Sequence, residues 1–90
     1  MFTNLEQLIK TIRERKNFSS NQSYTNKLLN DKKLSVSKLK EEIGELIEAV
    51  EENSNKIHEA TDVIYHLMVY LEANNVRIEE VMEELKKRQK

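Results

Sequence analysis

The sequence predicts an all-α protein, a helical bundle of four main helices, from two observations. The 90-residue chain has no proline and one glycine, the residues that most weaken a helix, and leucine, glutamate and lysine are abundant. Apolar residues recur at intervals of three and four, the spacing of one helix face. We expect residues 1–90 to form a single domain. The 38% apolar content is low for a monomer with its own full core, which favours completion by dimerisation.

The composition also excludes several classes of function. The net charge of −1 gives no support for a nucleic-acid or membrane partner. The absence of cysteine excludes disulfides, thiolate zinc sites and thiol nucleophiles. No apolar run reaches the roughly 18 residues of a membrane span, and the N-terminus lacks the pattern of a signal peptide. We therefore expect a cytoplasmic protein without DNA, RNA or membrane partners.

The first helix is expected to begin near Thr3, where a hydroxyl can cap it. Its apolar stripe consists of Leu5, Leu8, Ile9 and Ile12. The basic residues Arg13, Arg15 and Lys16 lie in its last turn, where cations complement the helix dipole. The alternative interpretation is a basic flank for a phosphate ligand.

The periodicity stops between residues 17 and 26, where small polar residues predict a loop. Such loops are often functional, although many only connect helices. Thr25 can cap a short helix that carries Lys27, Leu28 and Leu29. Residues 30–33 are expected to form a second connector.

The next main helix is expected to be capped by Ser35 or Ser37. Its apolar face consists of Val36, Leu39, Ile43, Leu46, Ile47 and Val50. At about 100° per residue, Glu42 and Glu45 border this face. Three other glutamates are expected to point into water, namely Glu41, Glu48 and Glu52.

Residues 53–55 predict a tight connector to a third main helix from Lys56 to Ala73. That helix is apolar on nearly every side, as a central helix is. Glu59, Asp62 and His66 interrupt it on one side, and for His66 a hydrogen-bonded core histidine is favoured over a metal ligand.

The last helix follows a stop at Asn74 and Asn75, residues that tolerate the left-handed conformation at a helix end. Its apolar face consists of Ile78, Val81, Met82 and Leu85. Acidic residues come early in it and basic residues late, the order that the helix dipole favours, so these charges are interpreted as structural.

Two acid pairs carry the strongest functional signal. Glu42 and Glu45 are three residues apart, as are Glu59 and Asp62, so each pair lies on one helix face. Two helices joined by a short link would turn these carboxylates toward each other, a repulsive arrangement without a cation and a site for Mg²⁺ with one. Bound Mg²⁺ suits nucleotide phosphates and hydrolysis within a polyphosphate. Solvated acidic helix faces are the competing explanation.

The acidic pattern also resembles a known signature. Glu-Glu-x-x-Glu at residues 41–45 and Glu-x-x-Asp at residues 59–62 resemble the metal-binding signature of the all-α nucleoside triphosphate pyrophosphatase superfamily. That superfamily includes MazG-like house-cleaning enzymes, dimeric dUTPases and phosphoribosyl-ATP pyrophosphatases. Residues 23–29 (Ser-Tyr-Thr-Asn-Lys-Leu-Leu), 62–69 and 76–85 are most similar to phosphoribosyl-ATP pyrophosphatases, the second enzymes of histidine biosynthesis.

The resemblance implies Mg²⁺-dependent hydrolysis of phosphoribosyl-ATP, a small-molecule nucleotide, to phosphoribosyl-AMP and pyrophosphate. It also implies a homodimer or higher homo-oligomer of this all-α fold. The implied metal ligands are Glu42, Glu45, Glu59 and Asp62, and the catalytic candidates are Glu41, Glu42 and Glu45. The candidate substrate-binding residues are Lys27, Ser23, Thr25 and, from the basic flank, Arg15.

Two alternatives stay open at this point. Glu48 and Lys40 depart from the histidine-pathway pattern, and residues 41–50 are more like the MazG-like branch, whose members destroy non-standard or excess nucleoside triphosphates. The more distant alternative is a non-catalytic helical dimerisation module whose acidic helix is only a soluble face.

Overall fold

The computed structural model describes residues 3–17 and 23–89, and over these residues the chain is helical, without strands. The five helices are α1 (Thr3–Arg15), α2 (Tyr24–Asn30), α3 (Lys32–Glu52), α4 (Lys56–Ala73) and α5 (Ile78–Arg88). The predicted all-α class is confirmed, and the short helix expected around Lys27 is α2. None of the described helices is both long and apolar enough to span a membrane.

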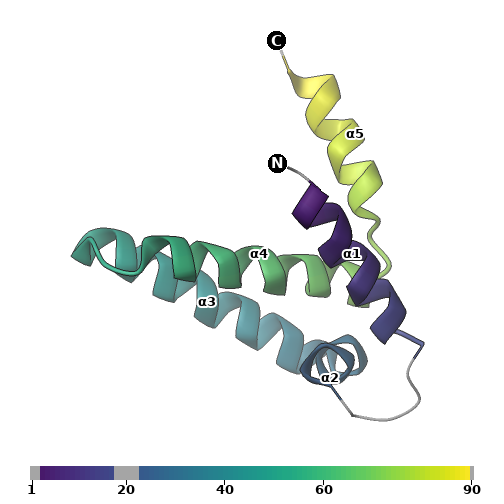
Figure 1. Ribbon diagram of the computed structural model, residues 1–90, viewed down its shortest axis with the longest axis horizontal. Coiled ribbons are helices and arrows are strands. Elements are labelled where there is room, and N and C mark those ends of the chain that lie inside the picture. The colour runs from purple at the N-terminus through teal and green to yellow at the C-terminus, as the bar shows by residue number, and fades with distance from the viewer. Residues whose placement is uncertain (1–2, 18–22, 90) are drawn as a thin grey trace.

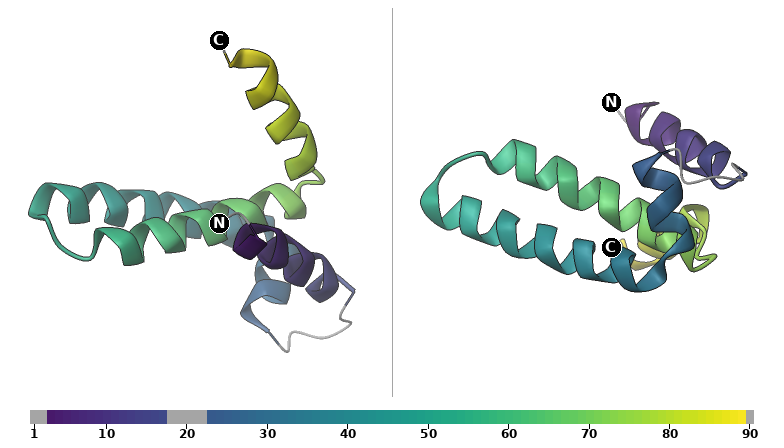
Figure 2. Two further views of the ribbon diagram at one scale, coloured as in Figure 1. Left: turned by 45° about the horizontal axis from the view of Figure 1, so that its top comes forward. Right: turned by 90° about the horizontal axis from the view of Figure 1, so that it is seen from below.

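Helices α3 and α4 form a long antiparallel hairpin (Figures 1 and 2). The link between them is short because Asn53 and Asn55 adopt left-handed backbone conformations, with φ of 55° and 50°. Asn53 ends α3, and its backbone N–H donates to carbonyls of the last turn. The predicted connector and the bounds of α4 are therefore confirmed, and the two helices lie side by side along their length.

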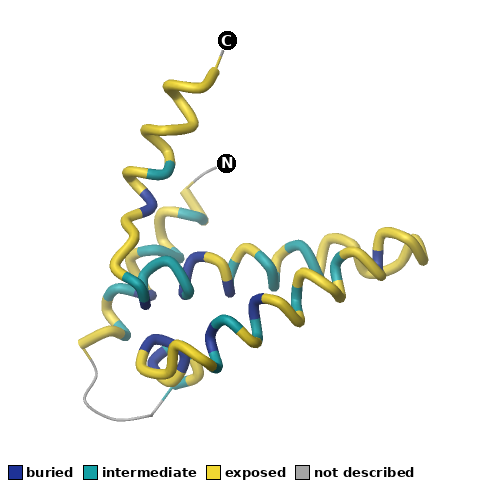
Figure 3. Tube along the Cα trace, turned by 180° about the vertical axis from the view of Figure 1, so that it is seen from behind, coloured by how far each residue is buried: buried dark blue, intermediate teal, exposed yellow. Residues whose placement is uncertain are grey.

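The core lies at the end of the hairpin remote from this link, where α4 contacts all four other helices. The predicted central position of α4 is thus confirmed. Figure 3 shows buried residues gathered at this end and mostly exposed residues toward the link. The buried apolar cluster consists of Ile12, Leu28, Leu29, Met68, Val69, Ala73 and Ile78.

Two predicted helix starts are wrong. Ser23 caps α2 by accepting a hydrogen bond from the Asn26 backbone N–H at 3.0 Å, so Thr25 is not its cap and part of the expected loop is helical. Asp31 caps α3 by accepting from the Leu34 N–H at 3.0 Å, in place of Ser35 or Ser37. One residue thus ends α2 and starts α3, and the expected four-residue connector shrinks to that residue. The rest of the expected loop, residues 18–22, lies outside the described residues.

Helix α5 leaves the same end of the molecule as α1 (Figure 1). Asn75, with φ of 59°, turns the chain after α4, as the pair of asparagines predicts. The buried Ile78 anchors the first turn of α5 in the core. Its later apolar residues Met82 and Leu85 are about half exposed. The helix is therefore held mainly at its base.

Candidate metal centre

Three of the predicted acids meet between the two helices of the hairpin. Glu42 and Glu45 lie one turn apart on α3, and Glu59 lies in the first turn of α4. Each offers one carboxylate oxygen, and these three oxygens all lie within 4.8 Å of one another. The convergence expected from the spacing and the short link is present for these residues, which we call the acid cluster.

The acid cluster is electrostatically costly as it stands. One oxygen of Glu42 and one of Glu59 are shielded from solvent and have no hydrogen-bond donor among the described residues. Burial raises the pKa of Glu42, and the neighbouring Glu45 and Asp62 raise it further. Burial is also the main cause that raises the pKa of Glu59, followed by Glu45. Uncompensated negative charge therefore collects at this point.

Asp62 lies beside the acid cluster, and its carboxylate pairs with a histidine of its own helix. Its carboxylate lies 3.4 Å from Nε2 of the exposed His58, four residues earlier on α4. His58, Glu59 and Asp62 form a second group whose ligand atoms lie within 4.8 Å of one another, so Glu59 belongs to both groups. His58 was not among the residues predicted from the sequence, although its spacing to Asp62 places the two on one helix face.

The donor chemistry of these residues fits a hard divalent cation. Glu42, Glu45 and Glu59 supply only carboxylate oxygens, the donors that Mg²⁺ binds, and one oxygen of Glu42 and one of Glu59 have no hydrogen-bond partner within the described part of the chain. A cation between them would remove the mutual repulsion and satisfy the shielded oxygens. The acid cluster is therefore a candidate metal centre.

The other glutamates of α3 lie outside the acid cluster. Glu41 is exposed and pairs with Lys38 at 3.1 Å, one turn earlier on the helix. Glu48 and Glu52 are also exposed, as expected, and with Glu45 and Glu59 they line a hollow of about 170 Å³ beside the link. The acidic surface therefore continues from the acid cluster toward the tip of the hairpin.

The candidate substrate-binding residues lie on two helices at the core end. Ser23 and Thr25 already have partners, because Ser23 caps α2 and the Thr25 hydroxyl hydrogen-bonds the Tyr65 hydroxyl. Lys27 is exposed on α2, which packs against both helices of the hairpin. Arg15 ends α1, and its carbonyl accepts from the Asn26 side chain at 2.7 Å. Their role toward a substrate stays a prediction.

His66 is a buried, hydrogen-bonded histidine, as predicted. Its Nδ1 lies 2.9 Å from the carbonyl oxygen of Asp62, and its Nε2 lies 3.0 Å from the hydroxyl of Tyr24. The second contact joins α4 to the start of α2, and sequence analysis missed it because the two residues lie 42 positions apart.

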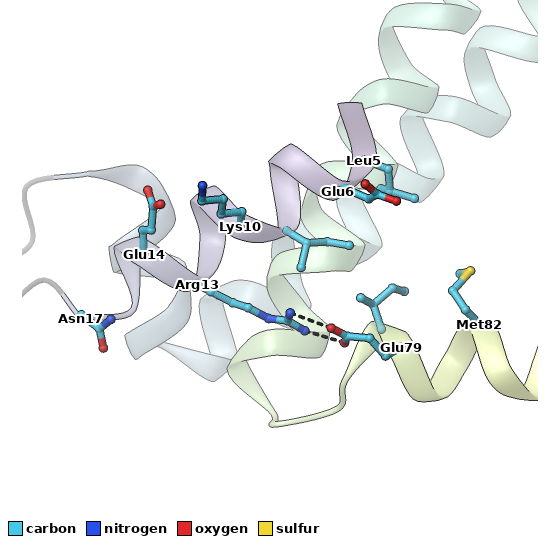
Figure 4. A pocket seen from close by; sticks show the side chains of 10 residues that line it. Leu5, Glu6, Lys10, Arg13, Glu14, Asn17, Glu79 and Met82 are labelled. Carbon is cyan, nitrogen blue, oxygen red and sulfur yellow. Dashed lines mark hydrogen bonds and ion pairs between the residues drawn. The ribbon is translucent and has the colours of Figure 1, made fainter. Parts of the chain in front are cut away.

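A larger hollow of about 1080 Å³ lies elsewhere, between α1 and α5 (Figure 4). Its apolar lining is supplied by Leu5, Ile9, Ile78 and Met82. Arg13 donates two hydrogen bonds to Glu79, at 2.8 and 2.7 Å, and so ties α1 to α5 at this groove. No acid-cluster residue lines it, so this groove is separate from the candidate metal centre.

Comparison with known proteins identifies relatives over most of the chain. Residues 5–89 match the Phosphoribosyl-ATP pyrophosphohydrolase family. A phosphoribosyl-ATP pyrophosphatase of Bacillus cereus is 42% identical over 86 residues, which cover 90% of this chain and 78% of that protein. A phosphoribosyl-ATP pyrophosphatase of a Caulobacter species is 38% identical over 91 residues, which cover 99% of this chain and 85% of that protein. The chloroplastic histidine biosynthesis bifunctional protein hisIE of Arabidopsis thaliana is 44% identical over 69 residues. These residues cover 73% of this chain and 25% of that protein.

Proposed function

Because the chain belongs to the phosphoribosyl-ATP pyrophosphohydrolase family, we propose that it hydrolyses phosphoribosyl-ATP to phosphoribosyl-AMP and pyrophosphate, the second step of histidine biosynthesis. The observation that carries the proposal is the meeting of Glu42, Glu45 and Glu59 between two helices. A pyrophosphohydrolase must neutralise the negative charge of a polyphosphate, and a site made of carboxylates can do so only with a divalent cation.

We propose Glu42, Glu45, Glu59 and Asp62 as the ligands of Mg²⁺. When bound, Mg²⁺ neutralises phosphate charge and lowers the pKa of a coordinated water. Asp62 would join the other three by turning its carboxylate away from the exposed His58, which requires only a side-chain rotation of the half-buried aspartate. Of the catalytic candidates, Glu42 and Glu45 are better situated than the outward-facing Glu41 to accept the proton of the attacking water.

We propose that the substrate's phosphates and sugar bind beside the acid cluster, against the α2 segment. Lys27 is exposed on this helix and supplies positive charge, and Ser23, Thr25 and Arg15 lie at the same end of the molecule. Lysine binds phosphate as a point charge on a flexible stem. We propose that the substrate is a small-molecule nucleotide of the cytoplasm.

We propose that the active form of this single all-α domain is a homodimer. Apolar side chains on the hairpin are a third or more exposed over its outer half, namely Ile43, Ile47, Val50, Ile57, Ile64 and Leu67. On each helix these residues recur at intervals of three, four or seven, so they share a helix face, and an exposed apolar face is typical of an association surface. A second hairpin packed on this face would give a bundle of four long helices, two from each chain.

A substrate panel tests the proposed activity. Pyrophosphate release is measured from phosphoribosyl-ATP and, in parallel, from dUTP, dCTP, dATP and ITP, each with Mg²⁺ and with EDTA. We expect Mg²⁺-dependent release from phosphoribosyl-ATP with a kcat/KM at least tenfold above every triphosphate. Preferential turnover of a triphosphate would assign the chain a house-cleaning role instead, and no turnover of any would support the dimerisation module.

A further inference from the structure

A bridge of two hydrogen bonds joins the acid-bearing helix to α2. Nδ1 of His66 faces the carbonyl oxygen of Asp62 at 2.9 Å. Because a carbonyl can only accept, Nδ1 carries a hydrogen and donates it. In the neutral ring, Nε2 then has a lone pair, which accepts from the Tyr24 hydroxyl at 3.0 Å. The tautomer of His66 is thus set by a backbone carbonyl of α4, the helix that carries Glu59 and Asp62.

Aromatic contacts fix the orientation of this bridge. The rings of Tyr24 and Tyr65 stack with centroids 6.4 Å apart and planes 18° apart. His66 meets Tyr65 edge-on at 5.0 Å and Tyr24 edge-on at 5.8 Å. Beside them, the hydroxyls of Thr25 and Tyr65 hydrogen-bond each other. Two consecutive residues at the start of α2 are therefore held by two consecutive residues of α4.

The bridge is close to the acid cluster. His66 lies one helical turn beyond Asp62 on α4, and its Nδ1 contacts the Asp62 carbonyl directly. Tyr24 lies in the segment that also carries the candidate substrate-binding residues Ser23, Thr25 and Lys27. At seven residues, α2 depends on tertiary contacts: Leu28 and Leu29 anchor its later turn in the core, and the bridge holds its first turn.

We propose that His66 and Tyr24 are positioning residues that set the distance between the α2 segment and the acid cluster. This inference rests on the proposed function, since it assigns α2 a role toward phosphoribosyl-ATP. With the bridge intact, Lys27 and the carboxylates are held in one arrangement before substrate arrives. Without it, substrate binding must fix the position of the first turn of α2, which weakens binding while the chemistry at the acid cluster is kept.

The Tyr24→Phe variant tests the bridge, because it removes the hydroxyl and keeps the stacked ring. We expect KM for phosphoribosyl-ATP to rise about two- to tenfold, the range for one neutral hydrogen bond, with kcat within twofold of the unchanged chain. Tyr70→Phe is the matched control, since Tyr70 lies on the same helix outside the bridge, and it should leave both constants unchanged.

The variants His66→Gln and His66→Leu separate positioning from a merely structural role. A glutamine oxygen can still accept from Tyr24, so KM should lie between the values of the unchanged chain and His66→Leu. The Tyr24→Phe/His66→Leu double variant should raise KM no more than His66→Leu alone, because both substitutions remove the same hydrogen bond between Tyr24 and His66. Lower melting temperatures with unchanged KM in all folded variants would overturn the inference and leave the proposed function standing. If the unchanged chain leaves phosphoribosyl-ATP intact, the proposed function itself fails, and the inference fails with it.

Discussion

Glu42 on α3 and Glu59 on α4 offer carboxylate oxygens within 4.8 Å of each other, and each has one oxygen shielded from water without a hydrogen-bond donor. Two such groups from different helices are expensive to fold together. Most glutamates of a folded protein lie on its solvent-exposed surface, where their charge is hydrated. We therefore interpret this pair as the part of the fold that a divalent cation completes.

Replacing Glu42 by glutamine should stabilise the protein in EDTA. The change removes a charge whose pKa is raised by burial and by neighbouring acids, so ionisation of Glu42 at pH 7 opposes folding. One kcal/mol moves the melting temperature of a domain of this size by roughly 4–8 °C, so even a small gain is measurable by thermal denaturation. Glu51→Gln, an exposed glutamate of the same helix, is the control and should change little. A lower melting temperature for Glu42→Gln would contradict the repulsion argument.

Adding Mg²⁺ should raise the melting temperature of the unchanged chain. A ligand that binds only the folded state at 100 times its dissociation constant stabilises it by about 2.7 kcal/mol. Glu45→Gln should abolish most of this rise because it removes the charge of one of the three converging carboxylates and replaces one of its oxygens by an amide NH₂. Differential scanning fluorimetry with and without 10 mM MgCl₂ measures both effects, with KCl of equal ionic strength as the control. Equal rises in the two proteins would remove Glu45 from the ligand set.

The Arg13–Glu79 pair should make stability depend on acid pH. Hydrogen bonds from Arg13 lower the pKa of Glu79 to about 2, below its ordinary value of 4.5. A lowered pKa means that the contribution is complete above about pH 4.5 and is lost as the pH falls toward 2. The melting-temperature difference between the unchanged chain and Glu79→Gln should therefore shrink between pH 5 and pH 2. A constant difference over that range would exclude an ionic origin.

Replacing Ile47 by aspartate should shift the protein from dimer to monomer. Ile47 is 55% exposed in the single chain and lies on the apolar face proposed to bind a second hairpin. A carboxylate there would be buried without a partner in the dimer. Sedimentation velocity gives the mass, and Lys33→Asp at the exposed start of α3 serves as control. A monomeric unchanged chain, or a dimeric Ile47→Asp variant, would contradict the proposed interface.

Much of the fold could be predicted because strong local signals agree. Helix α4 begins and ends where expected, since asparagines that accept the left-handed conformation flank a continuous apolar segment. The starts of α2 and α3 could not be predicted. Ser23, Thr25, Asp31, Ser35 and Ser37 are all good caps, and tertiary packing decides among them. The exposed Ile57 and Ile64 show that a central helix need not be covered on every side within one chain.

The candidate site was predictable to the extent that spacing fixes a helix face. The separation of three residues and the short link are enough to bring Glu42, Glu45 and Glu59 together. The rotamer of Asp62, which turns to His58, depends on a side-chain choice that spacing does not encode. The Tyr24–His66 contact depends on how α2 folds back onto α4, which requires the whole core.

The central claim is tested most directly by titrating Mg²⁺ into phosphoribosyl-ATP hydrolysis by the unchanged chain, Glu59→Gln and Glu51→Gln. Glu59 belongs to both groups of converging ligand atoms, whereas Glu51 belongs to neither. We predict saturable Mg²⁺-dependent pyrophosphate release by the unchanged chain and Glu51→Gln, and a loss of at least a hundredfold in Glu59→Gln. Full activity of a folded Glu59→Gln variant at the same Mg²⁺ concentration would contradict the assignment of the metal centre.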